Sequence, residues 1–331
     1  MGSDSFCRNY DFEIDKIVDF VKNIGARRVL LQLPEGLQLC APMIIKAIKE
    51  KLDNVEVYLS QNPSYGACLL DEYSAYELEA DAIIHVGHVE YPYYKPRKPT
   101  LFVKASYIAI DRSRLKAILN EVCMLRSSIK ICIGTTAQHI DVVKDVVKDL
   151  SSCKVTRYGI VLGCIPLNID ECDVIVVIAG GRFHCISQAL YTISSNRAVD
   201  VLCIDPYTYN AWSPSKDVER IVRIRMWKVR EAFDARKWLI IDGFYGQHRP
   251  HLVQVLAAKL RNLGREYVIS KALRIDRELL DNIGAQNFDA IVIVACPHVA
   301  FDLYDYVKPV LTVGEALMAL NGDVSRYIYP W

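Results

Sequence analysis

Short apolar runs alternate along the chain with longer segments in which apolar residues recur every three or four positions. Runs of the first kind are typical of buried strands, and the second pattern is typical of amphipathic helices. Strands that are apolar throughout belong to parallel sheets covered by helices on both faces. We expect strands at 28–33, 55–59, 82–86, 100–104, 129–133, 154–158, 174–179, 199–205, 238–242, 267–270, 290–294 and 310–313, and helices at 13–24, 39–51, 71–79, 115–125, 140–150, 186–194, 214–234, 251–263, 277–283 and 315–320.

The same order of strands and helices occurs three times, in units of about a hundred residues, the size of an ordinary domain. The pattern predicts an α/β protein of three structurally repeated parallel-sheet domains around a central cavity. The expected domains are 1–110, 111–212 and 213–331. Because ligands of such sheets bind beyond the carboxyl ends of the strands, we expect the functional residues there.

Composition narrows the function classes. The chain has 331 residues, is half apolar and carries a net charge of +1, which gives no electrostatic signal for nucleic acid. No apolar run is long enough to span a membrane, and the polar N-terminal segment lacks a secretory signal, so we expect a cytoplasmic protein. Because that compartment is reducing, the eleven cysteines predict no disulfide framework, and most of them are expected to be core residues.

Three cysteines differ from the rest in their sequence setting. Cys68 follows the strand expected at 55–59, within Ser-Tyr-Gly-Ala-Cys. Cys164 follows the strand at 154–158 and lies between a glycine and Ile-Pro, and Cys296 follows the strand at 290–294 and precedes Pro-His. Thiols in such loops are placed for binding or chemistry rather than for core packing. We therefore expect these three thiols to meet and to hold one metal centre.

The type of centre stays open at this point. Zinc would require a fourth protein ligand or a catalytic water. Three thiolates could instead hold three irons of a [4Fe–4S] cluster and leave the fourth iron open to substrate. The alternative is that the three thiols are unrelated, since no short Cys-x-x-Cys spacing supports a metal site.

Four motifs along the chain carry a family resemblance. They are Leu33-Pro34-Glu35-Gly36, Ser64-Tyr65-Gly66-Ala67-Cys68 with Asp71-Glu72, Gly180-Gly181-Arg182-Phe183-His184 and Ala295-Cys296-Pro297. These motifs resemble those of the diphthamide-synthesis family, the archaeal 2-(3-amino-3-carboxypropyl)histidine synthases. The resemblance spans nearly the whole chain, in the family's order. One departure is the segment 242–249, where the family would have Gly-Thr-Leu-Gly-Arg-Gln-Gly or a close variant.

The resemblance implies a cluster-dependent transferase. Cys68, Cys164 and Cys296 would bind a [4Fe–4S] cluster whose open iron engages S-adenosylmethionine. By a radical mechanism, a 3-amino-3-carboxypropyl group would move to a histidine of translation elongation factor 2, the first step of diphthamide synthesis. The enzyme would be a homodimer, would need an electron donor and would release methylthioadenosine.

Other polar residues at expected strand ends are candidates for binding. Leu33, Pro34, Glu35 and Gly36 could present backbone amides to S-adenosylmethionine, although Pro and Gly also form ordinary turns. Gly181, Arg182 and His184 form a second candidate group, in which Arg182 could bind the methionine carboxylate. His88 could donate a hydrogen bond to substrate or orient the target imidazole, and a structural role is its alternative.

Two rival functions remain. One is a quinolinate-synthase-like dehydratase, which would also place one cluster cysteine in each of three repeated units. The other is a non-catalytic cluster-carrying subunit, which the departure at 242–249 keeps open. Formation of methylthioadenosine from S-adenosylmethionine would distinguish the transferase from both.

Overall fold

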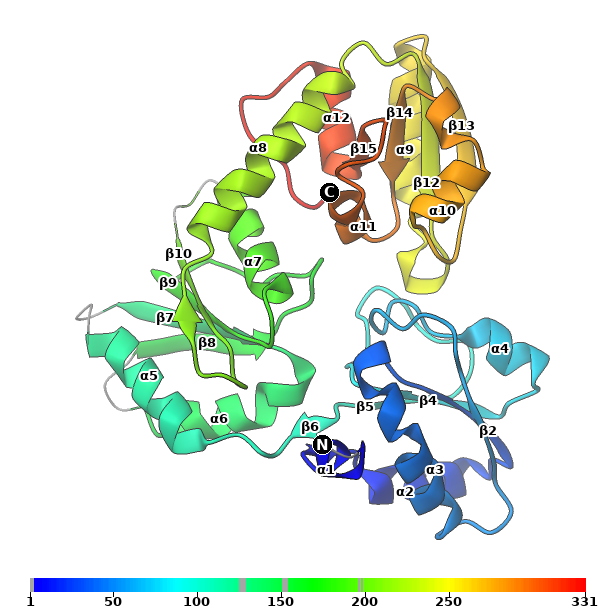
Figure 1. Cartoon of the computed structure of the whole chain (residues 1–331), viewed down its shortest axis with the longest axis vertical. Helices are drawn as coiled ribbons and strands as arrows, with labels where there is room; N and C mark the ends of the chain where they lie inside the picture. Colours follow the sequence, from blue (N-terminus) through cyan, green and yellow to red (C-terminus); the bar gives the residue numbers. More distant parts are fainter. Residues whose placement is uncertain (1–2, 125–128, 151–153, 196, 198) are drawn as a thin grey trace. The chain divides into compact units, whose positions relative to one another are not determined.

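The chain forms two compact units in a computed structural model that describes residues 3–124, 129–150, 154–195, 197 and 199–331. The first unit comprises 1–112 and 137–145, and the second comprises 113–136 and 146–331. Leu125, where one expected helix ends, lies outside the described residues. Figure 1 labels the helices and strands of both units.

The first unit is built on a four-stranded parallel sheet of order β3-β2-β4-β5. Alternate residues of β2 face opposite sides, so that Val29 and Leu31 pack against α2 and α3, whereas Leu30 packs with Ala75 of α4. Gly25 ends α2 in the left-handed conformation that glycine tolerates best. The elements are α1 Ser3–Cys7, β1 Tyr10–Asp11, α2 Ile14–Ile24, β2 Arg28–Gln32, η1 Glu35–Cys40, α3 Ala41–Lys49, β3 Glu56–Leu59, α4 Glu72–Glu77, β4 Ala82–Val86, β5 Thr100–Val103, β6 Ser106–Tyr107 and η2 Ala137–His139, with α6 Ile140–Lys148 starting here and ending in the second unit.

The second unit contains two sheets. Their orders are β11-β10-β9-β7-β8, in which only the short β11 is antiparallel, and β13-β12-β14-β15, which is parallel throughout. The elements of the first sheet and its helices are α5 Arg112–Met124, which starts at the last residue of the first unit, β7 Lys130–Thr135, β8 Lys154–Ile160, β9 Val174–Ile178, α7 Phe183–Ser194, β10 Asp200–Ile204 and β11 Ala211–Trp212. Those that follow are α8 Ser215–Glu231, β12 Lys237–Asp242, η3 Tyr245–Gln247, α9 Pro250–Asn262, β13 Glu266–Lys271, α10 Arg277–Asn282, η4 Ala285–Asn287, β14 Ala290–Ile293, α11 Pro297–Asp302, β15 Val310–Thr312 and α12 Val313–Asn321.

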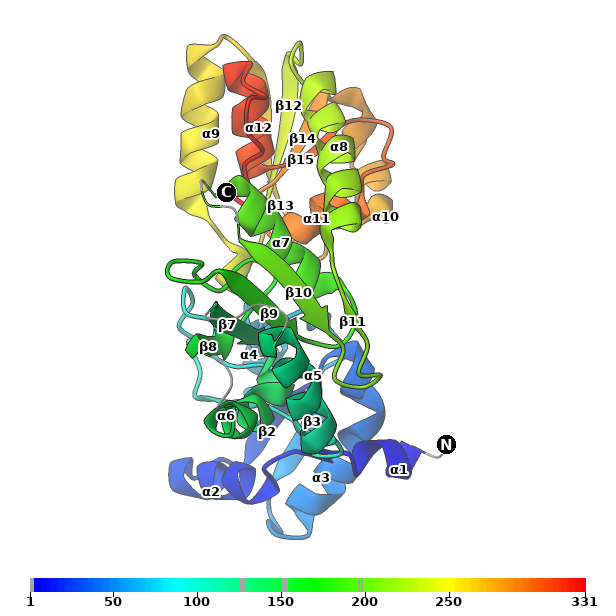
Figure 2. The ribbon, with the colours of Figure 1, turned by 90° about the vertical axis from the view of Figure 1, so that its left-hand side faces the viewer.

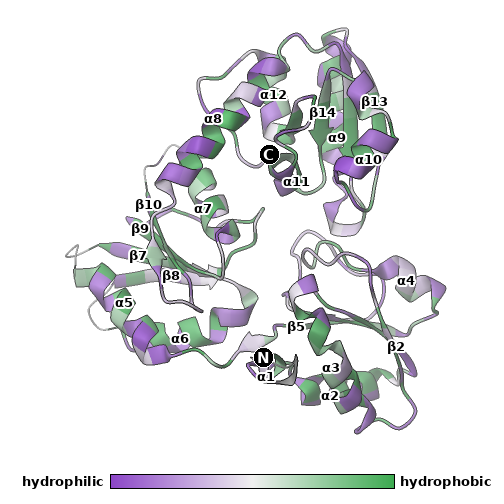
Figure 3. Cartoon of the chain, in the orientation of Figure 1, coloured by the Kyte–Doolittle hydropathy of each residue, from purple (hydrophilic) through white to green (hydrophobic). Residues whose placement is uncertain are grey.

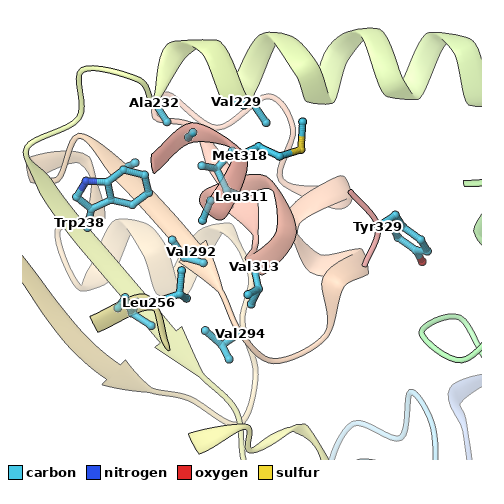
Figure 4. Packing of buried hydrophobic residues seen from close by; sticks show 14 of the residues in the cluster. Val229, Ala232, Trp238, Leu256, Val292, Val294, Leu311, Val313, Met318 and Tyr329 are labelled. Atoms are coloured by element: carbon cyan, nitrogen blue, oxygen red, sulfur yellow. The ribbon is translucent and has the colours of Figure 1, made fainter. Parts of the chain in front are cut away.

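Helices cover both faces of the last sheet, as its apolar strands require (Figure 2). On one face, Trp238, Val292 and Leu311 pack with side chains of α8, α9 and α12. Figure 4 shows this cluster, with Tyr329 of the C-terminal segment at its edge and the phenol hydroxyl pointing away from the aliphatic side chains. On the other face, strand residues pack with Leu280 of α10 and with α11.

All three large sheets share one strand order. When the strands of each sheet are counted in the order of the sequence, the first lies between the second and the third, and the fourth is next to the third. This confirms the predicted α/β class and its parallel sheets. The division into three domains at 110 and 212, and their arrangement around a central cavity, stay predictions.

Two local predictions need correction. The helix expected at 39–51 is a 3-10 helix over Glu35–Cys40 followed by α3, so the helical backbone begins directly after Pro34. The helix α11 after Cys296 was not expected, because its six residues are too few to show a helical period.

The prediction that the chain lacks disulfides is wrong. Disulfides join Cys7 to Cys40, Cys132 to Cys172 and Cys185 to Cys203, with Cα atoms 5.6, 5.7 and 5.9 Å apart. These distances are within the range that a disulfide requires. The partners come from separate elements that pack together in the core, so their spacing along the sequence gives no signal, and each looked like an isolated core thiol.

Figure 3 shows the hydropathy behind this architecture, with apolar strands at the centre of each sheet and helices that carry both polar and apolar faces. Among the described residues, no helix combines the length and apolarity needed to cross a membrane.

Candidate functional site

Cys164 and Cys296 lie on two loops of the second unit, each beyond the carboxyl end of a parallel strand. Cys164 lies in a tight turn after β8, closed by reciprocal backbone hydrogen bonds between Leu162 and Ile165 of 2.9 and 3.1 Å. Cys296 precedes α11 in an extended conformation and occupies its N-cap position. Both side chains are half-buried. The strand-end placement predicted for both residues is confirmed.

The backbone carbonyl of Gly163 connects these two loops. His298, two residues after Cys296, donates from Nε2 to the Gly163 oxygen over 3.0 Å, and the Tyr329 hydroxyl donates to the same oxygen over 2.7 Å. The Ser187 hydroxyl of α7 is 3.1 Å from His298 Nε2. A residue next to Cys164 is therefore bound by a residue near Cys296 and by the C-terminal segment.

Only glycine fits at position 163. A Cβ atom there would lie 2.4 Å from the Phe183 ring and 2.9 Å from His298 Nε2, both far inside contact distance. The missing side chain allows the backbone of the Cys164 loop to approach α7 and His298 closely.

Both thiols contribute to the electrostatic surroundings of Tyr329. Burial raises the pKa of the Tyr329 phenol well above its ordinary value, and the charges of Cys164 and Cys296 raise it further. Burial also lowers the pKa of His298 to about 4, so this imidazole is neutral near pH 7. The Tyr329 hydroxyl and the His298 N–H are consequently neutral donors, and both donate to the Gly163 carbonyl.

Cys68 lies in the first unit, in the loop between β3 and α4. Its neighbour Leu69 donates to the Gly66 carbonyl and accepts from the side-chain amide of Gln32, over 3.0 and 3.1 Å. Asp71 caps α4 through Ser74 and accepts from the Ser60 hydroxyl over 2.6 Å. The loop thus has a fixed backbone on both sides of its thiol.

Three cysteines remain thiols, unlike the disulfide-bonded ones: Cys68, Cys164 and Cys296. All three are half-buried, whereas the paired cysteines lie in the core. Within the part of the chain that the structure describes, no three His, Cys, Asp or Glu side chains are grouped closely enough to hold a metal ion. The meeting of all three thiols at one centre stays a prediction.

Two predicted binding segments of the first unit lie together. A Cβ atom on Gly87 would be 2.9 Å from the Pro34 ring, so the turn after β2 packs against the turn after β4 that carries His88. Leu33 is fully buried in the core, which leaves its backbone as the part able to bind a ligand. Glu35 and Gly36 lie in η1, and no atom is near a Cβ placed on Gly36.

The third predicted segment follows β9. Gly181 has a φ of 68°, and its N–H donates to the Asp205 carboxylate over 3.2 Å. Arg182 forms an ion pair with Asp217 and stacks 4.5 Å above the Trp212 ring. His184 lies in the first turn of α7. The ion pair uses the Nη2 atom of the guanidinium, and a substrate carboxylate bound by Arg182 would have to share the guanidinium with Asp217 or displace it.

Comparison with known proteins decides the family. The family model for diphthamide synthesis proteins matches residues 33–330. The chain belongs to the diphthamide synthesis family. Among its curated relatives, the 2-(3-amino-3-carboxypropyl)histidine synthase of Pyrococcus horikoshii is 33% identical over 92% of this chain and 89% of the relative. The enzyme's subunit 1 from Gallus gallus is 32% identical over 97% of this chain and 80% of the relative.

A solved structure agrees with this membership. The crystal structure of Dph2 from Pyrococcus horikoshii with a 4Fe-4S cluster has a TM-score of 0.80 and 30% sequence identity, and the match covers 96% of this chain and 93% of that one. The family fold therefore extends over nearly all of the present chain.

One segment departs from the sequence expected for the diphthamide synthesis family. Residues 242–249 begin at the buried Asp242, whose carboxylate binds His248 Nδ1 and accepts the Arg249 backbone N–H over 3.0 Å. Arg249 stacks 4.1 Å above the ring of the C-terminal Trp331. The segment is therefore a well-packed turn held by its own aspartate.

Sequence reasoning missed several residues of the site. His298 lies two residues after Cys296, and the sequence Cys-Pro-His could have indicated that this histidine belongs to the site. Gln32 and His85 interrupt apolar strands, which is a detectable signal of buried polar function. Tyr329 is 166 residues from Gly163, and nothing in its local sequence indicates the contact.

Proposed function

We propose that this chain is a 2-(3-amino-3-carboxypropyl)histidine synthase that modifies a histidine of translation elongation factor 2. The net reaction breaks the bond between the sulfur and Cγ of S-adenosylmethionine, forms a bond from that carbon to an imidazole carbon, and releases methylthioadenosine and a proton. Its family membership and the names of its relatives support the transferase class. The observation that carries the proposal is the joint anchoring of the Cys164 and Cys296 loops on Gly163.

The donor set fits an iron–sulfur cluster. Cluster irons are ligated by thiolates, and Cys68, Cys164 and Cys296 are thiols while the other described cysteines are tied in disulfides. Cys68, Cys164 and Cys296 would hold a [4Fe–4S] cluster with one iron open. When bound, the cluster would supply one electron to cleave the Cγ–S bond of S-adenosylmethionine and would take one electron back as the alkylated imidazole loses its proton.

The protein groups around the thiols bind and position. His298 and Tyr329 fix the Cys164 loop, and Gln32 fixes the Cys68 loop. The backbone of Leu33, Pro34, Glu35 and Gly36, together with Gly181, Arg182 and His184, would bind S-adenosylmethionine.

Its cellular setting follows from the same proposal. The protein would act in the cytoplasm, where its target factor works, as a homodimer supplied with electrons by a separate reductase. Nucleic acid and membrane are not among the proposed partners.

The test is an anaerobic transfer assay with S-adenosylmethionine, dithionite and elongation factor 2. We expect methylthioadenosine together with a mass gain on the factor equal to one 3-amino-3-carboxypropyl group. Cys68→Ala, Cys164→Ala and Cys296→Ala should abolish both products, whereas Cys7→Ala/Cys40→Ala, which removes a disulfide, should retain them. An intact cluster without methylthioadenosine would instead favour the cluster-carrying subunit, and quinolinate formed from small acids would favour the dehydratase.

A further inference from the structure

A chain of three polar side chains crosses the core of the first unit beneath the Cys68 loop. Gln32 and His85 are fully buried in the neighbouring strands β2 and β4, and His88 follows β4 in a half-buried position. His85 Nδ1 lies 3.0 Å from Gln32 Oε1, and His85 Nε2 lies 3.0 Å from His88 Nδ1. Buried polar side chains nearly always have hydrogen-bond partners, and those partners determine which atoms carry the protons.

Backbone groups fix the orientation of the Gln32 amide. Its Nε2 donates to the Leu69 carbonyl over 3.1 Å, and its Oε1 accepts from the Asp71 N–H over 3.1 Å. A backbone carbonyl cannot donate and a backbone N–H cannot accept, so the amide has one satisfactory orientation. Because the Gln32 oxygen only accepts, His85 must carry a proton on Nδ1.

The same logic determines the proton on His88. Full burial lowers the pKa of His85 well below its ordinary value, and the adjacent His88 lowers it further, so His85 is neutral. With its proton on Nδ1, His85 presents a lone pair on Nε2, and His88 must donate to it from Nδ1. Burial lowers the pKa of His88 to about 4, so this ring is neutral as well and its Nε2 is unprotonated.

We propose that His88 Nε2 is a binding group that accepts a hydrogen bond from an N–H donor of the substrate. Within the described residues, the hydrogen bond found for His88 is the one through Nδ1, which leaves the lone pair on Nε2 for a ligand. The proposed role is the opposite of the hydrogen-bond donation considered from the sequence. A ring so weakly basic holds a donor in place rather than removing its proton.

The inference rests on the proposed function for the identity of the donor. Two substrate groups have this chemistry: the imidazole N–H of the target histidine and the ammonium group of S-adenosylmethionine. The turn carrying His88 lies at the carboxyl end of β4 and packs on Pro34 of the predicted binding segment. Assays with and without the elongation factor distinguish these two donors.

The first test reads the protons directly. Long-range ¹⁵N–¹H correlation spectra of the full chain, labelled at histidine, should show His85 and His88 both protonated on Nδ1 and unprotonated on Nε2 at pH 7. His88→Ala identifies the His88 signals by their loss. A proton on His88 Nε2 would overturn the proposal, whatever reaction the protein performs.

The second test uses the cluster-loaded enzyme with His88→Ala, and His251→Ala on the exposed surface of α9 as a matched histidine control. Loss of one ligand hydrogen bond should reduce kcat/KM for transfer about tenfold. If the donor is the target imidazole, methylthioadenosine formation without the factor stays at the wild-type rate. If the donor is the ammonium group, KM for S-adenosylmethionine rises in that same reaction.

Equal rates for His88→Ala and wild type in both reactions would also overturn the proposal. Failure of the proposed function would give a different result from failure of this inference. In that case the wild type would form no methylthioadenosine, but the spectra would still show both histidines protonated on Nδ1. Iron content and unfolding midpoint of His88→Ala report whether the variant is folded.

Discussion

His298 donates a hydrogen bond to the backbone carbonyl of Gly163 over 3.0 Å, across 135 residues of sequence. This contact connects the loop of Cys164 to the helix that begins after Cys296. The Tyr329 hydroxyl reaches the same carbonyl, so two side chains from distant parts of the chain fix one peptide group. The two loops that carry the thiols of the second unit are joined at this shared acceptor.

Removal of the Tyr329 hydroxyl should loosen the Cys164 loop. We expect Tyr329→Phe to lower the free energy of unfolding by about 1 kcal/mol and to shorten the lifetime of the bound cluster in air, because one buried hydrogen bond is lost. Visible absorbance during exposure to oxygen measures that lifetime. Tyr304→Phe, at an exposed tyrosine of the same unit, is the control and should behave as the wild type.

A methyl group at position 163 should be poorly tolerated. In Gly163→Ala the added carbon would overlap the Phe183 ring, and the resulting strain should cost about 1–3 kcal/mol. Denaturant unfolding would measure the difference. Gly36→Ala has open space around its Cβ, and its unfolding midpoint should be unchanged. Equal stability of both variants would show that the loop can move away from α7.

A buried ion pair supports the helix that follows Cys296. Arg225 binds Glu315 and donates to the carbonyl of Ala300 in α11 over 2.7 Å. Arg225→Met leaves the Glu315 carboxylate buried without its cation, which should cost about 3–5 kcal/mol. The double variant Arg225→Met/Glu315→Leu should recover a large part of that loss. A double variant no more stable than the single one would contradict this explanation.

Acidification should destabilise the first unit through its buried histidines. The pKa of His88 is about 4 in the folded chain, whereas an exposed histidine has an ordinary value near 6.5. The unfolded state therefore binds more protons between these values, and the stability that is complete above about pH 6.5 is lost as the pH falls toward about 4. Urea unfolding of the cluster-free chain at several pH values measures the slope, which His88→Ala should reduce. An equal slope in wild type and variant would contradict the assignment.

The sheets could be predicted because their strands are apolar on both faces. Runs such as Val174–Ile178 have no competing helical period, and glycines mark the turns that follow them. Short elements carry less information, which is why β1, β6, β11 and α11 were not expected. The disulfides were missed for a related reason, since Cys132 and Cys172 are brought together by packing and not by spacing.

The candidate site was predictable only in part. Glycine and proline beside Cys68, Cys164 and Cys296 indicated loops at strand ends, and the loops are there. The side chains that position these loops are far away in the sequence, as Tyr329 is from Gly163. Local sequence patterns therefore do not predict such contacts. Arg182 could be chosen as a candidate, but its ion pair with Asp217 follows from folding alone.

The most direct test of the three-thiol centre is the iron and sulfide content of anaerobically reconstituted protein. The wild type and Cys7→Ala/Cys40→Ala should each bind about four irons per chain, as a [4Fe–4S] cluster requires. Cys68→Ala, Cys164→Ala and Cys296→Ala should each retain less iron and lose the cluster's visible absorption. Wild-type iron content in any one of these three variants would contradict the role of that thiol as a ligand, and a wild type that binds no iron would contradict the centre itself.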